Sequence, residues 1–443
     1  MLYQVMLILV MVIVLLEMGW LVKQTGYLFL LFVTSCLQEF TKGLSIINLD
    51  SGQYNLELNN YTYFSNAGLI YYTYLSIFYL LINVFVLIAN IYFVKSSIFY
   101  YPSRDKRYNI VYMVGYSGVL YLFLDMLVSG IPLLSDGSIN RYNFWTDYSK
   151  LPLAKYVSLM LTIICVALGF KSASQKILNI KNRNWLYLFA LILITRMFLG
   201  YKASGLVDLL IGFSIGYFYR IYVIEKKRSV IKLFAYIMAI YVILVVFFAV
   251  TQITSGKYNN FYEAIQGIFY RAVSTSGHME WSVFSDPSIA NSWWINDSSE
   301  LLSIFRGDDD MKPYIGVYGL MDRYAPSETF TLYFDKKVRF ASGFIGVSAF
   351  YNGRIMTVII CAINAMIIST FYYLFKKMAL HNMVYTFSML YYVYNIFSTY
   401  LDGSGTLTSF YNINTYLYLL LIILIYFIEK NYLRKHNCSL VCE

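Results

Sequence analysis

Charged side chains interrupt long apolar stretches of the sequence, and these residues are the first candidates for chemistry. Arg196, Asp125 and Asp208 each lie inside an apolar run. An ionisable group there is costly in lipid and usually marks a functional site. Lys202 follows Arg196 after the turn at Gly200. An arginine fork binds phosphate through two parallel hydrogen bonds, and a lysine binds it as a point charge. The grouping therefore predicts a site for an anionic ligand.

The rise of an α-helix places these charges close to one face of the membrane. Arg196 follows Trp185 by eleven residues, which is ~17 Å at ~1.5 Å per residue. Asp125 follows Ile110 by fifteen residues, or ~22 Å. Both stretches are expected to enter from the cytoplasm, so both side chains belong to the outer half of the bilayer.

Arg354 is expected to lie in the same layer. The stretch 343–374 holds 32 residues where ~20 suffice for one crossing. Its first part is rich in glycine and polar atoms, so we expect that part to be interfacial or broken and the crossing to begin near Arg354. The expected cationic pocket combines three cations with two supporting carboxylates: Arg196, Lys202 and Arg354 with Asp125 and Asp208.

The largest polar stretch, residues 253–342, is expected to be a folded loop outside the membrane. It contains three tryptophans and many Tyr and Phe residues, which disordered segments lack. Asn260 and Glu263 have the spacing of a capping box, and the apolar residues that follow them share one helical face. The segment 260–272 therefore predicts an amphipathic helix on the outer leaflet.

Residues just after this helix complete the candidate site. Arg271 would be held at the membrane surface, and His278 and Glu280 follow within ten residues, where a proton acceptor can face the same ligand. No metal and no cofactor are expected, because no cluster of His and Cys is present and Asp308–Asp310 has the character of a charged turn. Three loop aromatics are candidates for stacking on sugars or for packing the loop: Trp281, Trp293 and Trp294.

Each candidate also has a structural explanation, which stays open at this point. Arg196 could pair with Asp125 or Asp208 simply to hold helices together. Lys202, Arg271 and Arg354 could extend to lipid headgroups. The charged loop residues could simply be solvated.

The apolar stretches themselves define the architecture. Of the 443 residues, 59% are apolar and 13% are charged, where a soluble domain has about 25% charged residues. This composition excludes a soluble enzyme, a nucleic-acid-binding protein and a secreted disulfide scaffold. We expect an all-α polytopic membrane protein with about eleven spans, at 2–22, 25–41, 67–94, 109–134, 153–170, 185–200, 203–224, 233–252, 343–374, 379–400 and 411–428.

Basic residues set the orientation. They gather in the connections near 95–107, 171–183, 226–232 and 376–377 and in the C-terminal tail, so the positive-inside rule places these segments in the cytoplasm. The large loop then faces the periplasm. Three parts are expected: membrane helices in residues 1–252 with about eight spans, the loop in 253–342, and about three further spans with a cytoplasmic tail in 343–443.

This pattern resembles the Wzy-type O-antigen polymerases of the bacterial inner membrane. One shared feature is ten or more spans with a single large periplasmic loop before the last three. A second is the stretch 195–205, which looks like the Gly-x-Arg-type turn of that family, with Lys202 where an arginine is commoner. A third is a loop that opens with Phe269-Tyr270-Arg271 and closes with Ala325-Pro326 followed by Gly343, Gly346 and Gly353.

The resemblance implies a polymerising glycosyltransferase with a GT-C-like membrane fold. Its donor and acceptor would be undecaprenyl-diphosphate-linked oligosaccharides at the periplasmic face, without a nucleotide sugar, and its partner a chain-length-regulating co-polymerase. Arg196, Lys202, Arg271 and Arg354 would stabilise the leaving diphosphate, and His278 or Glu280 would accept the proton. The alternatives are a lipid-linked oligosaccharide flippase or transporter, an O-antigen ligase, and another lipid-phosphate-dependent glycosyltransferase.

Overall fold

The computed structural model describes most of the chain: residues 2–52, 66–92, 107–135, 139, 144–177, 179, 183–200, 203–225, nine positions within 235–253, and 258–270, 276–290, 292–294, 315–335, 340, 342–399 and 413–440. These residues form helices joined by short turns, and no strand occurs among them. The all-α class is therefore confirmed for the described part of the chain.

Long helices dominate the structure. The membrane-length and neighbouring helices are α1 (Leu2–Thr25), α2 (Val33–Asp50), α3 (Ala67–Ile91), α4 (Arg107–Ser129), α5 (Ala154–Ile177), α6 (Asn184–Phe198), α7 (Ala203–Glu225), α15 (Phe344–Leu380), α16 (Val384–Thr399) and α18 (Ile413–Leu440). Six segments of the described chain are long and apolar enough to cross a membrane; they lie in α1, α3, the α4 region, α5, α15 and α18. This is the pattern of a helical membrane protein.

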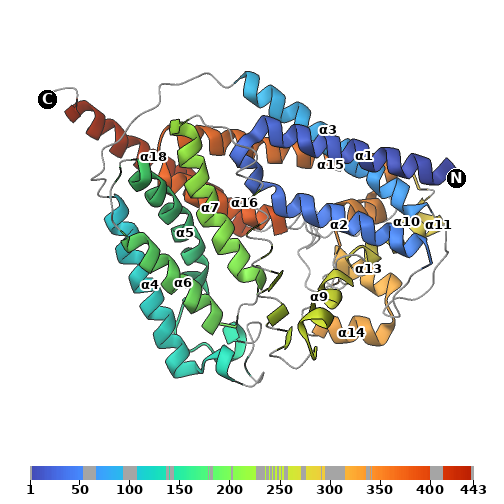
Figure 1. The fold of residues 1–443 in the computed structure, drawn as a ribbon, viewed down its shortest axis with the longest axis horizontal. Coiled ribbons are helices and arrows are strands. Elements are labelled where there is room, and N and C mark those ends of the chain that lie inside the picture. Colours follow the sequence, from blue (N-terminus) through green and yellow to red (C-terminus); the bar gives the residue numbers. More distant parts are fainter. Residues whose placement is uncertain are drawn as a thin grey trace.

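Figure 1 shows the helices in two groups, with α4, α5, α6 and α7 in one and α1, α2, α3 and α15 in the other. Helix α16 joins the groups, because it packs on α5, on α15 and on α18. The short loop helices lie beside α2 and the start of α15: α9 (Phe261–Tyr270), α10 (His278–Ser285), α11 (Pro287–Ala290), α13 (Val317–Tyr324) and α14 (Ser327–Asp335).

Glycines set the close packing of α5 on α7. A Cβ atom on Gly169 would collide with the carbonyl oxygen of Phe213, and one on Gly216 would collide with that of Val166. Small residues allow two helix backbones to approach and gain van der Waals contact, which is the main attraction between helices in lipid. The pair Gly169 and Gly216 therefore fixes the core of the first group.

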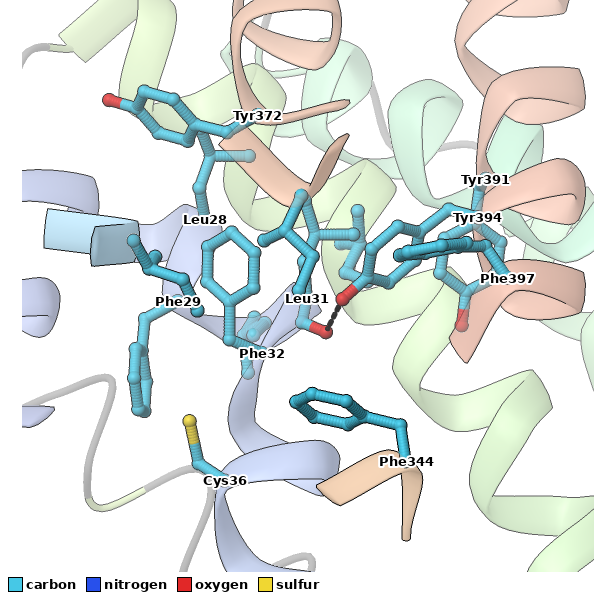
Figure 2. Close-up of a cluster of buried hydrophobic side chains, with 14 of the residues drawn as sticks. Leu28, Phe29, Leu31, Phe32, Cys36, Phe344, Tyr372, Tyr391, Tyr394 and Phe397 are labelled. Atoms are coloured by element: carbon cyan, nitrogen blue, oxygen red, sulfur yellow. Dashed lines mark hydrogen bonds between the residues drawn. The ribbon is translucent and has the colours of Figure 1, made fainter. Parts of the chain in front are cut away.

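The second expected span, 25–41, is wrong in its position. Helix α1 ends at Thr25, residues Gly26–Leu31 form a 3-10 helix, and α2 extends to Asp50. The 3-10 segment lies among buried aromatic and aliphatic side chains, where the Tyr394 hydroxyl donates to the carbonyl oxygen of Leu31 at 2.8 Å (Figure 2). The chain turns back there, and α2 returns alongside α3 with its Glu39 and Lys42 side chains buried. The expected span 233–252 lies mostly outside the described residues.

The predicted helix after a capping box at Asn260 and Glu263 is confirmed. Helix α9 begins after Asn260, whose side-chain oxygen accepts from the Glu263 amide at 2.9 Å, while the Glu263 carboxylate accepts from the Asn259 amide at 3.1 Å. Its apolar side chains Phe261 and Phe269 are exposed, and the expected position of the helix on the outer leaflet stays a prediction.

Helix α15 is broken where the sequence indicated. Gly353 has φ 71° and ψ −177° inside the helix, so the 37-residue segment consists of a short first part and a long crossing that starts at Arg354. This backbone conformation is essentially restricted to glycine. The excess length of the segment is therefore explained by a break and not by an extended span.

Candidate functional site

Arg354 lies at the break of α15, beside two exposed tryptophans of the loop. Its guanidinium lies 5.5 Å from the centre of the Trp293 ring. Trp293 is 57% exposed and Trp294 is 63% exposed. The cation also lies at the first turn of the long crossing, where the positive end of the helix dipole favours an anion. Positive charge and flat aromatic faces thus meet at one place.

Backbone hydrogen bonds fix this arrangement. The amide of Arg354 donates to the carbonyl oxygen of Ser292 at 3.1 Å, and the amide of Ile355 donates to that of Trp293 at 3.1 Å. These amides are free for the loop because the helix is interrupted at Gly353, where a Cβ atom would collide with the backbone of Trp294. The break therefore docks the loop segment 292–294 onto the membrane helix.

A buried ionic cluster lies between α2, α3, α10 and α15. Lys42 Nζ donates to Glu39 Oε1 at 2.8 Å and to the carbonyl oxygen of Ser342 at 3.1 Å. The Tyr71 hydroxyl donates to Glu39 Oε2 at 2.6 Å. Cys36, Glu39 and other residues line an adjacent cavity of about 20 Å³, enough for one water molecule. The cluster ties α2 to α3 and to the segment that enters α15.

Glu280 completes this cluster from the loop side. The Gly343 amide donates to Glu280 Oε1, and no hydrogen bond reaches Glu280 Oε2 in the described structure. Burial raises the pKa of Glu280 to about 7; Lys42 and the Gly343 amide oppose that rise, and Glu39 adds to it. Glu280 is fully buried, so an acceptor hydroxyl can reach it only if α10 moves away. In this structure it connects the loop to the membrane helices.

His278 is the first residue of α10 and is also buried. The preceding Gly277 amide donates to the Ser45 hydroxyl at 3.1 Å, and a Cβ atom on Gly277 would meet the backbone of Lys42. The predicted proton acceptors His278 and Glu280 thus lie together on α10, against α2. They do not face the exposed tryptophans.

Asp50 forms a second junction that the sequence did not indicate. Its Oδ1 accepts from Trp281 Nε1 at 3.0 Å, and its Oδ2 accepts from the Gly68 amide and the Tyr3 hydroxyl, each at 3.0 Å. One carboxylate therefore joins the starts of α1 and α3, the end of α2, and the loop helix α10. Trp281 is buried here and packs the loop, so it is not a sugar-stacking residue in this structure.

A salt bridge between Arg323 and Asp286 holds the outer part of the loop together. Asp286 Oδ2 accepts from Arg323 at 2.8 Å and from the Tyr324 hydroxyl at 3.0 Å. Burial alone would raise the pKa of Asp286, but the hydrogen bonds from Ser288 and Tyr324 and the Arg323 charge outweigh it and lower the pKa. Arg323 also lies 5.8 Å from the centre of the Phe350 ring on α15. The loop is thus folded, and Arg323 packs it against the first part of α15.

The other predicted site residues have different surroundings. Arg196, on α6, donates to the carbonyl oxygen of Ser158 at 2.6 Å and to the Thr162 hydroxyl at 3.2 Å, both on α5. Helix α6 and helix α15 belong to different groups (Figure 1). The structure therefore does not bring Arg196 to Arg354, and the expected single pocket is not formed by these two side chains.

Asp125 does not support a cation as expected, and the expected role of Asp208 stays a prediction. Asp125 accepts from the Ser149 hydroxyl at 2.7 Å and from the amides of Lys150 and Leu151 at 3.1 and 3.0 Å, so it holds the connection into α5 and not a cation. Asp208 is exposed on α7. Lys202 and Arg271 lie outside the described residues and stay predictions.

Similarity to known proteins is limited. The model of a family of unknown function (DUF6418) matches residues 310–419. This segment is about a quarter of the chain and includes the broken helix α15 with Gly353 and Arg354. No functionally curated protein and no solved structure matches the chain.

Proposed function

We propose that this protein is a membrane glycosyltransferase that polymerises undecaprenyl-diphosphate-linked oligosaccharide units at the periplasmic face. The observation that carries the proposal is the position of Arg354 at the break of a membrane helix, stacked on Trp293 beside a second exposed tryptophan. A lipid-linked sugar diphosphate presents a negative charge and a sugar ring at the same height of the membrane. The site offers a partner for each.

Arg354 has the chemistry that the reaction needs. The acceptor hydroxyl forms a bond to the anomeric carbon of the donor sugar while the bond from that carbon to the diphosphate oxygen breaks. The negative charge that develops on the diphosphate is stabilised by a fixed guanidinium and by the positive end of the helix. The exposed faces of Trp293 and Trp294 hold the sugar through stacking. A base takes the acceptor proton; Glu280 takes this role only in a state in which α10 has moved.

The test is a set of variants in a bacterium that depends on this chain for its surface polysaccharide. Arg354→Ala should abolish the long-chain ladder while the protein stays in the membrane, and Arg354→Lys should recover little of it, because a point charge does not replace a bidentate fork. Trp293→Ala should shorten the ladder. Arg183→Ala removes an exposed arginine at the start of α6 and serves as the matched control.

The pattern of products separates the rival functions. Loss of the ladder with one capped repeat unit retained supports a polymerase. Loss of all repeat units from the surface in the Arg354→Ala strain would point to a flippase or a ligase. An unchanged ladder would contradict any role of Arg354 in the reaction.

A further inference from the structure

An apolar groove runs between α15, α16 and α18, away from the candidate site. Its volume is about 710 Å³, within the usual range for small-molecule sites. Met366, Phe371 and Leu374 of α15 form one wall, and Leu390 of α16 and Ile422 of α18 face them. Helix α18 packs mainly on α16 and is largely exposed elsewhere, so the groove separates it from α15.

The groove has the length of one lipid leaflet. Along α15 it extends from Met366 to Met378, which is a rise of twelve residues or ~18 Å of helix. Half of the hydrocarbon core of a bilayer is ~15 Å. The long crossing begins at Arg354, twelve residues before Met366, so the groove occupies the half of the membrane opposite the loop.

Cations lie at the far end of the groove. Lys377 is part of its lining, and Lys430 Nζ lies 5.3 Å from the centre of the Tyr426 ring, which also lines it. His381 is close by: burial lowers the pKa of His381, and the charges of Lys377 and Lys430 lower it further. Both lysines therefore lie at this end of the groove, which the positive-inside rule places in the cytoplasm.

We propose that this groove binds an anionic phospholipid of the cytoplasmic leaflet. The acyl chains lie between α15 and α18, and the phosphate contacts Lys377 and Lys430. The occupant is not the lipid-linked donor of the proposed reaction, because the diphosphate of that donor belongs at the opposite membrane face, beside Arg354. The inference does not depend on the proposed enzymatic function. It predicts that the lipid joins α18 to the rest of the protein.

Lipid-dependent melting of the full chain tests the proposal. The protein is purified in detergent, delipidated, and mixed with phosphatidylglycerol or with phosphatidylcholine. Phosphatidylglycerol at about 100 times its Kd should raise Tm by about 3 °C, since a ligand that binds only the folded state stabilises it by mass action. Phosphatidylcholine should raise it much less. Native mass spectrometry should show one retained phosphatidylglycerol.

Two kinds of variant separate headgroup from chain contacts. The double change Lys377→Gln and Lys430→Gln alters partly exposed positions, and should weaken phosphatidylglycerol binding about tenfold, which is ~1.4 kcal/mol. Its matched control is Lys23→Gln, at an exposed lysine on the same membrane side. Thr370→Trp fills the groove. Its control is Thr73→Trp, at an exposed position of α3. In the parent protein, the Thr73 and Thr370 hydroxyls each donate to the carbonyl oxygen four residues before them.

Three results would overturn the proposal. One is an equal Tm increase with both lipids. Another is unchanged phosphatidylglycerol binding in the double lysine variant or in Thr370→Trp. A third is a dimer that is disrupted by Thr370→Trp while no lipid is retained, because a second copy of the chain would then occupy the groove.

Discussion

Lys42 is one ammonium group between two buried carboxyl groups, and this imbalance governs the chemistry of the cluster. Glu39 is paired with Lys42 and accepts a hydrogen bond from Tyr71, so its charge is well compensated. Glu280 faces the same lysine; its Oε1 accepts from the Gly343 amide, and its Oε2 has no hydrogen-bond partner among the described residues. A buried charge without full compensation is costly. The proton on Glu280 therefore determines how well the loop fits against α2 and α15.

The raised pKa of Glu280 predicts a stability that falls as pH rises. The pKa moves from 4.5 to about 7 on folding, so below pH ~4.5 the carboxyl is neutral in both states and costs nothing. Between pH ~4.5 and ~7 the unfolded state ionises first, and the free energy of unfolding decreases by on the order of 3 kcal/mol, at ~1.36 kcal/mol per unit. Glu280→Gln should remove this dependence.

Melting of the purified chain at pH 5 and pH 8 measures the effect. The Glu280→Gln variant should match the parent at pH 5 and have the higher Tm at pH 8. Glu328→Gln is the matched control, because Glu328 is an exposed glutamate of the same loop. A parent Tm that rises from pH 5 to pH 8, with no change in Glu280→Gln, would refute the assignment.

Replacing Lys42 should lower the free energy of unfolding, because it leaves a buried carboxylate without its cation. Lys42→Met leaves Glu39 without its cation in a buried site, and loss of one partner of such a pair costs about 3–5 kcal/mol. The double change Lys42→Met and Glu39→Gln should be milder, because no uncompensated charge remains on α2. Expression and Tm of these two variants and of Glu39→Gln form a double-mutant cycle. A loss in the double variant equal to the sum of the two single losses would show that the pair is not coupled.

Part of the ionic cluster around Lys42 could be predicted from the sequence. Glu39 and Lys42 are three residues apart, a spacing that places both on one helix face, and that spacing was a usable signal. Their pairing with Glu280 was not predictable, because Glu280 is more than two hundred residues away and only the tertiary fold brings it to α2. In the same way, Asp50 was a loop residue in the sequence and is a four-element junction in the structure.

At the scale of elements, the close packing of α5 on α7 depends on glycines at the contact, Gly169 and Gly216. Gly216→Ala places a Cβ atom against the carbonyl oxygen of Val166, and no flexible side chain can move aside to make room. We expect the two helices to separate and the Tm to fall by several degrees. Gly19 is exposed on α1 with nothing within 4 Å of an added Cβ atom, so Gly19→Ala should not lower the Tm. A normal Tm for Gly216→Ala would show that the helices do not pack this closely.

The sequence predicted a helix best where the length of its apolar stretch was informative. The 32-residue stretch was too long for one crossing, and the structure breaks it at Gly353, next to the predicted start. The second span was wrong, because the apolar run ending at Phe40 does not show that the chain turns back at Gly26–Leu31. η1 packs against α7 and lies among side chains from α15 and α16, and sequence periodicity does not report these tertiary contacts.

At the scale of the whole molecule, side-chain junctions place the loop and the lysine-rich end of α15 at opposite ends of the membrane helices. Asp50 brings together the starts of α1 and α3 and the loop helix α10, so these segments share one side of the membrane helices. At the other end of α3, the Asn90 side-chain oxygen accepts from Lys376 at 2.7 Å and from Tyr372 at 2.8 Å. The lysine-rich end of α15 is therefore opposite the loop, as the positive-inside rule requires.

This arrangement predicts which surfaces an impermeant thiol reagent can reach. In a background without the five native cysteines, Ser327→Cys places one thiol at the exposed start of α14 in the loop, and Asn184→Cys places one at the exposed start of α6. Ser327→Cys should react in intact spheroplasts, and Asn184→Cys only after the membrane is opened. The reverse labelling pattern would show that the protein has the opposite orientation in the membrane. Arg354 and its tryptophans would then face the cytoplasm, where no periplasmic polymerisation can occur.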